Sequence, residues 1–443
     1  MSAKRFRVAI CGGGIGGLTC AVALSKYPDI DVYVYEAGTS FAQNGPGCGV
    51  WLRTWNILQK LGLDQDLAKI AGTQPTDDPV STFSFRKSDR AEGIDFLQLT
   101  TRGGLLGIHR SDFSRVLLQH LPSTYRTHCF KRLLSYRQRS SYPGPIELVF
   151  ADGTTATCDV LIGADGIKSS VRRSLLREQG YRARADGRQR DYDHLLDSVD
   201  PVWSGTLAYT AVISAERLKA RAPQHRAFDQ PTQYLGKNGY ILVYPIAQGK
   251  IINVAGFHTR PGRENTSFAG PWIRRTERDE LLSAYSRWEP EVQVLLECIE
   301  KPSQWAVHTS KPLNSYVSGR VVLLGDAAHA MEPHQGTGAG QAIEDAYLLA
   351  TLLGQWRTTI DSIPHALRSY DAIRRPFAND IVRRNRLTGN QFMFLGDNFD
   401  WDNCPDDILR NRLRHLGGAI MNNWDWAWST TIDESVAEGI RML

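Results

Sequence analysis

The sequence predicts an α/β fold in which a Rossmann-type domain is interleaved with a mixed β-sheet domain and followed by a helical C-terminal region. One observation is the glycine-rich turn Gly12–Gly17, which comes directly after the apolar run Val8–Cys11. The other is a change to alternating apolar and polar residues between 203 and 260, followed by a return to a continuous apolar run at Val321–Leu324. Alternation is typical of half-buried strands and a continuous run of fully buried ones, so segments of two domains alternate along the chain.

Length and composition indicate an ordinary globular enzyme. The 443 residues exceed the usual size of one hydrophobic core, and the net charge of +5 is only mildly basic. We therefore expect no nucleic-acid partner, although small anionic substrates are favoured. Seven cysteines without paired spacing favour reduced thiols and a cytoplasmic location. No His/Cys cluster has metal-ligand spacing, and the five glycines in the only long uncharged stretch argue against a membrane segment, so we expect neither a metal nor a membrane partner.

The glycine-rich turn has the residues that a dinucleotide needs. Gly12 permits the tight turn out of the strand, Gly14 lets the backbone approach a pyrophosphate, and Gly17 lets the following helix pack closely on the strand. The helix expected from about residue 16 to 27 directs its free N–H groups at the phosphates. Glu36 ends the next expected strand, where a carboxylate accepts hydrogen bonds from ribose hydroxyls and repels a 2′-phosphate.

This turn alone is compatible with binding of NAD, NADP or FAD. It is also compatible with an ordinary glycine-rich turn in an α/β protein that binds no dinucleotide. Two later glycine–aspartate segments, Gly163–Gly166 and Gly325–His329, are what a flavin needs and a simple nicotinamide domain does not. Together they favour FAD.

The remaining elements follow from local pattern, and the loop 39–49 after the opening unit is rich in glycine and proline. We expect, in chain order, a strand pair within 76–100, a helix from residue 109, strands at 146–150, 159–163, 206–214, 239–245, 250–257 and 321–324, and a helix at 338–353. The charged stretch 179–200 is interpreted as a solvated loop. Arg374, Arg375, Arg383, Arg384 and Arg386 are expected to form a solvated helix face.

These motifs together resemble the class A FAD-dependent aromatic monooxygenases, most of all the fungal salicylate-hydroxylase-like branch, from about residue 6 to residue 390. The residues that carry the resemblance are Gly12–Gly17, Glu36, Gly47–Val50, His109-Arg110, Ala164–Arg172, Gly325–His329, Pro333–Gln341 and Tyr370–Pro376. The resemblance implies a glutathione-reductase-like domain that binds FAD, with NADH or NADPH and O2 as co-substrates, an aromatic substrate, and a monomer or homodimer. It places the FAD-binding domain at 1–75, 101–180 and 305–365, the substrate domain at 76–100 and 181–304, and a helical region at 366–443.

The resemblance also assigns roles to residues. Beyond the first turn and Glu36, the cofactor contacts that it implies are Gly49, Arg110, Asp165, Asp326, Gly338 and Ala339. Asp326 would hold the ribityl chain and pyrophosphate, Arg110 the phosphate or ribityl region, and Asp165 would support both FAD and the nicotinamide. The loop 336–340 would present backbone N–H groups to the flavin N1/O2 edge, where negative charge develops on reduction.

His334 is the candidate catalytic residue. The resemblance places it in the substrate pocket, and it follows Pro333 on the loop that would cap the flavin. A flavin monooxygenase delivers electrophilic oxygen, so removing a phenolic proton activates the substrate, and a histidine can accept that proton. Many relatives have an arginine where this chain has Thr210, which puts identical anchoring of an acidic substrate in doubt. Tyr240 and Tyr244 are expected to face the same pocket instead.

The predicted function is therefore hydroxylation of a phenolic aromatic acid, with conversion of salicylate to catechol and CO2 as the lead. The first alternative is ring hydroxylation or oxidative dearomatisation of another phenol in secondary metabolism. An alternative of another class is an NAD-dependent Rossmann dehydrogenase that uses only the first motif, and yellow flavin absorbance would exclude it.

Overall fold

The computed structural model describes residues 4–41, 47–138, 144–396 and 399–443, so the part of the glycine- and proline-rich loop at 42–46 lies outside the described residues. Its first sheet contains, in spatial order, β18 (Val317–Ser318), β19 (Val321–Leu323), β11 (Val160–Gly163), β1 (Phe6–Cys11), β2 (Ile30–Tyr35) and β7 (Arg126–His128). All neighbours are parallel except β18 and β19. The central strands are continuous apolar runs because helices cover the sheet. The predicted α/β fold class is confirmed.

The helices of this part follow the glycine-rich segments. α1 (Ile15–Leu24) packs against α11 (Gly338–Gly354) and α4 (Arg110–Gln119), while α2 (Leu52–Leu61) also contacts α11. Smaller elements complete the layer: α3 (Asp64–Ala71), α10 (Asp326–His329), the ribbon of β3 (Cys48–Val50) and β6 (Leu106–Ile108), and the sheet of β10 (Thr155–Cys158), β9 (Ile146–Phe150) and β8 (Leu133–Gln138).

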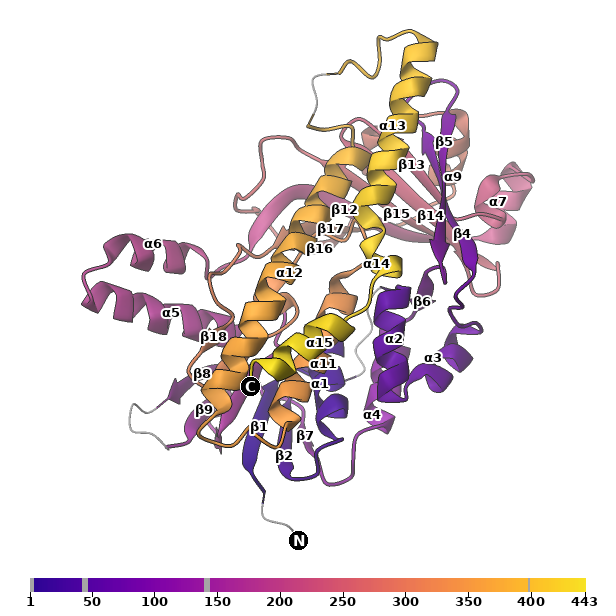
Figure 1. Ribbon diagram of the computed structural model, residues 1–443. Coiled ribbons are helices and arrows are strands. Elements are labelled where there is room, and N and C mark those ends of the chain that lie inside the picture. The colour runs from indigo at the N-terminus through magenta and orange to yellow at the C-terminus, as the bar shows by residue number, and fades with distance from the viewer. Residues whose placement is uncertain (1–3, 42–46, 139–143, 397–398) are drawn as a thin grey trace.

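A second, eight-stranded sheet forms the other half of the molecule (Figure 1). Its spatial order is β16 (Ile273–Arg275), β17 (Ser303–Thr309), β12 (Val202–Ser214), β15 (Ile251–Thr259), β14 (Gly239–Ile246), β13 (Thr232–Gly236), β4 (Pro79–Lys87) and β5 (Ile94–Arg102). Only the β13–β4 pair is parallel. One face packs on α7 (Ala215–Arg221), α8 (Arg278–Ala284) and α9 (Pro290–Glu297), and the other packs on the C-terminal helices.

The C-terminal region joins the two halves. The 30-residue helix α12 (Ile363–Phe392) runs from the parallel sheet towards the eight-stranded sheet, and α13 (Asp406–Trp424) lies beside it (Figure 1). α14 (Trp426–Ser429) packs on α2 and β5, and α15 (Asp433–Arg441) returns to α11. Within the described residues, no helix is both long and apolar enough to cross a lipid bilayer.

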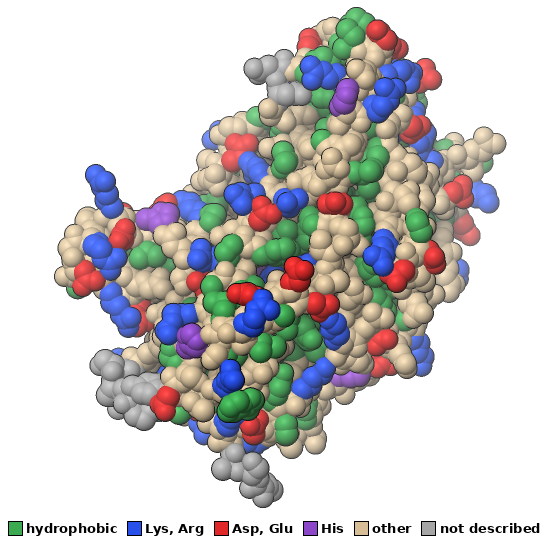
Figure 2. All heavy atoms as spheres, in the orientation of Figure 1, with side chains coloured by type: hydrophobic (Ala, Val, Ile, Leu, Met, Phe, Trp, Pro, Cys, Tyr) green, Lys and Arg blue, Asp and Glu red, His purple; other side chains and the backbone are tan. Residues whose placement is uncertain are grey.

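Two local predictions were wrong. The stretch 179–200 is not a loop, because it contains the second half of α5 (Ser170–Ala185) and the whole of α6 (Gln189–Asp197), which packs beside α5. Figure 2 shows charged side chains gathered over this projecting hairpin, and that surface charge hid the helical period. Arg374 is not on a solvated face. Its side chain is fully buried between Glu344 and Asp345 of α11, at 2.8 Å and 2.7 Å.

Candidate active site

The glycine-rich turn is as tight as the sequence requires. Gly12 adopts φ +113°, and a Cβ placed there would lie 2.1 Å from the carbonyl oxygen of Ala164 at the end of β11. A Cβ on Gly17 would lie 2.0 Å from the carbonyl oxygen of Gly12. A side chain at either position would separate β1, α1 and β11, so both glycines are needed for the close approach.

Glu36 is held at the mouth of this turn. Its two carboxylate oxygens accept hydrogen bonds from the backbone N–H groups of Gly13, at 2.7 Å, and Gly38, at 2.6 Å. Each oxygen keeps a second lone pair, so the carboxylate can still accept hydrogen bonds from sugar hydroxyls.

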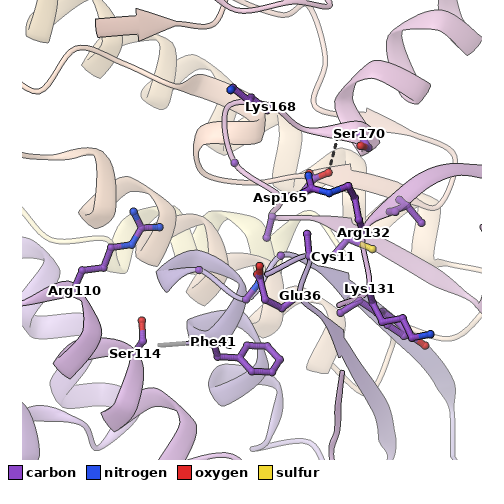
Figure 3. Close-up of a pocket in the computed structure, with 18 residues that line it drawn as sticks. Cys11, Glu36, Phe41, Arg110, Ser114, Lys131, Arg132, Asp165, Lys168 and Ser170 are labelled. Atoms are coloured by element: carbon purple, nitrogen blue, oxygen red, sulfur yellow. Dashed lines mark hydrogen bonds between the residues drawn. The ribbon is translucent and has the colours of Figure 1, made fainter. Parts of the chain in front are cut away.

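A cavity of about 250 Å³ opens over the turn. It brings together five of the predicted cofactor residues, which are Gly12, Gly14, Glu36, Arg110 and Asp165. Arg110 and Ser114 enter from α4 on one side, while Lys131 and Arg132 lie on the opposite side (Figure 3). A Cβ placed on Gly14 would lie 3.6 Å from the Arg110 guanidinium, so the arginine and the turn are adjacent. Gly17 lies beneath the turn and is not among the lining residues.

The Asp165 carboxylate binds the N-terminus of α5, a contact that the sequence did not predict. Its carboxylate accepts hydrogen bonds from the Ser169 hydroxyl and from the backbone N–H groups of Ser170, at 2.7 Å, and Val171, at 3.2 Å. Burial raises the pKa of Asp165, against the effect of these hydrogen bonds. It therefore ties the start of α5 to the cavity wall.

The second glycine–aspartate segment, Gly325–His329, is held in place by Asp345 of α11. Gly325 has φ +60°, and its N–H donates to Asp345 at 2.8 Å; the same carboxylate contacts the His329 ring at 2.6 Å. Although burial opposes ionisation, His329 and Arg374 hold the pKa of Asp345 well below its usual value. Asp326 itself is exposed at the first position of α10. Its carboxylate is thus available to a ligand.

The loop before α11 is braced from three helices. Trp51, at the start of α2, donates its indole N–H to the Gln335 carbonyl at 2.9 Å, and Asn385 of α12 accepts from the Gln335 N–H at 3.0 Å. The Gln335 side chain donates to Thr388 and to the carbonyl of Asn423 of α13.

Three predicted cofactor positions gather around this loop. Gly338 and Ala339 are half-buried at the start of α11, and a Cβ on Gly49 would lie 3.5 Å from the Gly336 carbonyl. At these positions the loop therefore presents backbone groups, not side chains, to a bound cofactor.

His334 is completely enclosed. One ring nitrogen, Nδ1, is 2.9 Å from the Tyr240 hydroxyl, and the other, Nε2, is 3.8 Å from a carboxylate oxygen of Glu332. The ring lies against Gly389 of α12, where a Cβ would be 2.4 Å away. Pro333, by contrast, is exposed. The structure therefore brings His334 and Tyr240 together.

Strand register assigns the remaining candidates to one face of the eight-stranded sheet. Tyr240 pairs with Phe257, which pairs with Ala208, and two residues further along Leu242, Ala255 and Thr210 form the next row. Paired residues point to the same side of a sheet, and so do residues two apart. Tyr244 therefore shares this face. Thr210 accepts a hydrogen bond from the Trp305 indole at 3.2 Å.

Three residues near His334 escaped sequence analysis. Glu332, Gly389 and Trp51 lie in separate segments, and only folding brings them to one place. Glu332 alone had a signal, since it directly precedes the motif Pro333–Gln341 and lies two residues before His334.

The residues present fit FAD. The glycine turn leaves room for phosphates, Glu36 can still accept from a ribose, and Arg110 supplies positive charge beside Gly14. Asp326 is exposed at the N-terminus of α10, and the start of α11 offers half-buried backbone. This donor set suits an extended dinucleotide that carries a ring system at its far end.

Comparison with known proteins agrees with this geometry. The FAD binding domain family matches residues 5–192 and 269–385. The chain is 36% identical to the FAD-dependent monooxygenase str9 of Strobilurus tenacellus, covering 99% of this chain and 98% of that protein. It is 35% identical to a salicylate hydroxylase of Pseudomonas putida, covering 99% and 95%. A solved salicylate hydroxylase substrate complex superposes with a TM-score of 0.81 at 30% identity, covering 98% of each chain.

Proposed function

Because the chain belongs to the class A FAD-dependent monooxygenases, we propose that it hydroxylates a phenolic aromatic acid with O2 and NADH or NADPH. The lead reaction is conversion of salicylate to catechol with release of CO2. The observation that carries the proposal is His334, a buried histidine that contacts a tyrosine hydroxyl between the cofactor loop and the eight-stranded sheet.

The cofactor would be held by three separate groups of residues. Gly12, Gly14 and Arg110 would contact the pyrophosphate, Glu36 the adenosine ribose, and Asp326 the ribityl chain and phosphates. When bound and reduced, FAD supplies electrophilic oxygen derived from O2. The N–H groups at the start of α11 would stabilise negative charge at the N1/O2 edge of the ring. Asp165 would support the cofactor through the loop that it caps.

His334 would accept the phenolic proton of the substrate. Salicylate-type hydroxylation adds oxygen to the carbon that carries the carboxylate, so an ortho phenolate must push electron density onto that carbon before CO2 leaves. The face that carries Tyr240 and Tyr244 would form the wall of the substrate pocket, with Pro333 near its edge. A general base of this kind typically contributes about 10²–10⁴-fold to the rate.

One structural observation favours a second candidate, namely ring hydroxylation or dearomatisation of a phenol without a carboxylate. The four central strands of the sheet, β12, β14, β15 and β17, are fully described and contain no lysine or arginine. A carboxylate placed over these four strands would therefore find no cation on them. Lys87 of β4 shares the face of Tyr240 through Leu235 but is already paired with Asp89, and Thr210 is bonded to Trp305.

A substrate panel separates the two candidates. FAD-loaded protein is mixed with phenolic acids and carboxylate-free phenols, and NADH and NADPH oxidation, CO2 and aromatic products are measured. Salicylate should give catechol and CO2 in proportion to the NAD(P)H consumed, and His334→Asn should lose this activity by about 10²-fold or more. Oxygenation without CO2 would favour the second candidate. An asparagine variant with undiminished turnover would remove His334 from the mechanism.

A further inference from the structure

Glu332 is a buried carboxylate for which the proposed reaction has so far no use. Its side chain is 5% exposed, and Oε1 lies 3.8 Å from His334 Nε2 and 3.0 Å from a guanidinium nitrogen of Arg386 on α12. Arg386 in turn approaches Glu264 at 3.5 Å near the surface. A buried carboxylate needs such partners, because burial without them disfavours its charged form.

The two nitrogens of the His334 ring have different surroundings. Nδ1 contacts the Tyr240 hydroxyl at 2.9 Å, whereas Nε2 is buried and has no hydrogen-bond partner among the described residues. The Glu332 carboxylate is the acidic group that faces Nε2. Burial opposes its ionisation, yet His334 and Arg386 hold the pKa of Glu332 below its usual value, so it is an anion near neutral pH.

We propose that Glu332 is the charged partner of His334: it keeps the ring proton on Nε2 and stabilises the imidazolium that forms when Nδ1 accepts the substrate's proton through Tyr240. The inference rests on the proposed function for the identity of the proton donor. Glu332 is a positioning residue, because it acts through His334 and not on the substrate.

The proton transfer balances without any other reactant. The substrate phenol gives its proton to the Tyr240 oxygen, while the Tyr240 hydroxyl proton moves to His334 Nδ1. The phenol becomes a phenolate and the imidazole an imidazolium, so the charges created are equal and opposite. The imidazolium carries protons on both nitrogens, with Nε2–H directed at Glu332. Tyr240 is neutral before and after the step, which suits its position because burial raises its pKa well above the usual value.

Among the described residues, few other charged groups lie near the His334 ring. Tyr240 comes from β14, and Phe257 of β15 and Gly389 of α12 add only uncharged contacts. Glu332 and Tyr285 act electrostatically on Tyr240, and Arg386 acts through Glu332. The pKa of the His334 imidazolium should therefore respond chiefly to Glu332 and Arg386, in opposite directions.

Nitrogen-15 NMR of histidine side chains in the FAD-loaded protein tests this without any substrate. The His334 signal is identified by its loss in His334→Asn. In the wild type, neutral His334 should carry its proton on Nε2. In Glu332→Gln the imidazolium pKa should fall by about one unit, a tenfold change in the protonation equilibrium. In Arg386→Met it should rise, and Glu332→Asp should lie between Glu332→Gln and the wild type.

The control is Glu289→Gln, which neutralises another buried carboxylate. Glu289 pairs with Arg86 at a distance of 2.8 Å and does not contact the His334 ring. It should leave the His334 pKa unchanged. The Arg386→Met and Glu332→Asp variants keep the test decisive if Glu332→Gln does not fold. A His334 pKa that is equal in the wild type and the Glu332 and Arg386 variants, or a wild-type proton on Nδ1, overturns the inference.

A second readout separates this inference from the proposed function. The absorbance of a bound phenolic acid reports its phenolate fraction, which at pH 7 should be about tenfold lower in Glu332→Gln than in the wild type. If the wild type oxidises no phenol but its His334 pKa shifts as stated, the proposed function fails while the Glu332–His334 pair stands. If the wild type hydroxylates a phenol and Glu332→Gln matches it in both readouts, only the pair fails.

Discussion

Single residues around the glycine turn divide into those that shape the backbone and those that present charge. Gly12 and Gly17 are required by close approach, since any Cβ there would lie within 2.1 Å of a carbonyl oxygen. Asp326 and Arg110 are exposed and contribute little to the fold. Replacing Asp326 or Arg110 should therefore change the affinity for FAD and leave the free energy of unfolding unchanged.

Asp326→Ala tests the cofactor assignment at this scale. Removing the carboxylate leaves ribityl hydroxyls or a phosphate-linked water without a partner, so FAD affinity should fall about tenfold or more. Asp361→Ala, another exposed aspartate, is the control and should bind FAD as the wild type does. Full flavin occupancy and unchanged affinity in Asp326→Ala would show that this carboxylate does not hold the cofactor.

Sequence reasoning succeeded here where one local constraint sufficed. A strand, a set of glycines and an acid at a fixed spacing determine the turn and Glu36 without help from the rest of the chain. The surroundings of His334 could not be predicted in the same way. Gly389 touches its ring and Tyr240 bonds to it, and neither proximity leaves a mark in a local pattern.

Helix α12 fixes the position of the proposed base, His334, because the backbone of Gly389 lies directly against the His334 ring. Gly389→Ala would place a methyl group 2.4 Å from that ring, so the ring must move and turnover should fall while FAD remains bound. Gly418→Ala on α13 is the matched control, since nothing lies within 4 Å of its added methyl group. Equal turnover numbers for the two variants would show that the position of the ring does not matter.

A buried ion network joins α2, α11 and α12. Arg53 and Arg374 both pair with Glu344, and Arg374 also pairs with Asp345, which holds Gly325 and His329. Removing one partner of such a network leaves an uncompensated buried charge, which typically costs about 3–5 kcal/mol.

Arg374→Met should therefore lower the free energy of unfolding by roughly that amount, measured by denaturant unfolding of the FAD-loaded protein. The neighbouring Arg375 forms a half-buried pair with Asp371, within one helix, and Arg375→Met should cost less than Arg374→Met, by about 1 kcal/mol or less. Similar decreases in the free energy of unfolding for both variants would mean that the buried network stabilises the fold no more than the Arg375–Asp371 pair does.

The prediction of a solvated arginine face failed at Arg374 for a physical reason. Arginine at a helix surface is normally exposed, and only the burial of two carboxylates on α11 reverses that expectation. Helices α5 and α6 were missed for the opposite reason. They project from the body, and the many charged residues of 179–200 led to their interpretation as a solvated loop, although Tyr192, Leu195 and Leu196 of α6 recur at helical spacing.

At the scale of the whole molecule, the chain crosses repeatedly between the parallel sheet and the eight-stranded sheet, and α12 spans both. This interleaving was predictable, because buried parallel strands and half-buried antiparallel strands differ in apolar pattern. The limits of the two domains stay a prediction. Within the described residues a single glycine-rich Rossmann turn is present, so NADH or NADPH would bind transiently at the flavin.

Substrate should therefore gate reduction of the flavin. We expect a bound phenol to accelerate reduction by NADH or NADPH, since a conformational step that admits the nicotinamide only with substrate present prevents wasteful consumption of O2. Stopped-flow absorbance of the flavin with and without substrate measures this. Reduction rates that are equal under both conditions would contradict gating.

The central claim is that this protein transfers one oxygen atom from O2 to a phenolic ring. Turnover of salicylate under ¹⁸O2 tests it directly, with product mass, CO2 and NAD(P)H consumption measured together. The account predicts catechol that carries a single ¹⁸O atom, with one CO2 released for each NAD(P)H consumed in coupled turnover. NAD(P)H oxidation that yields only hydrogen peroxide, or an unlabelled product, with every phenol tested would contradict it.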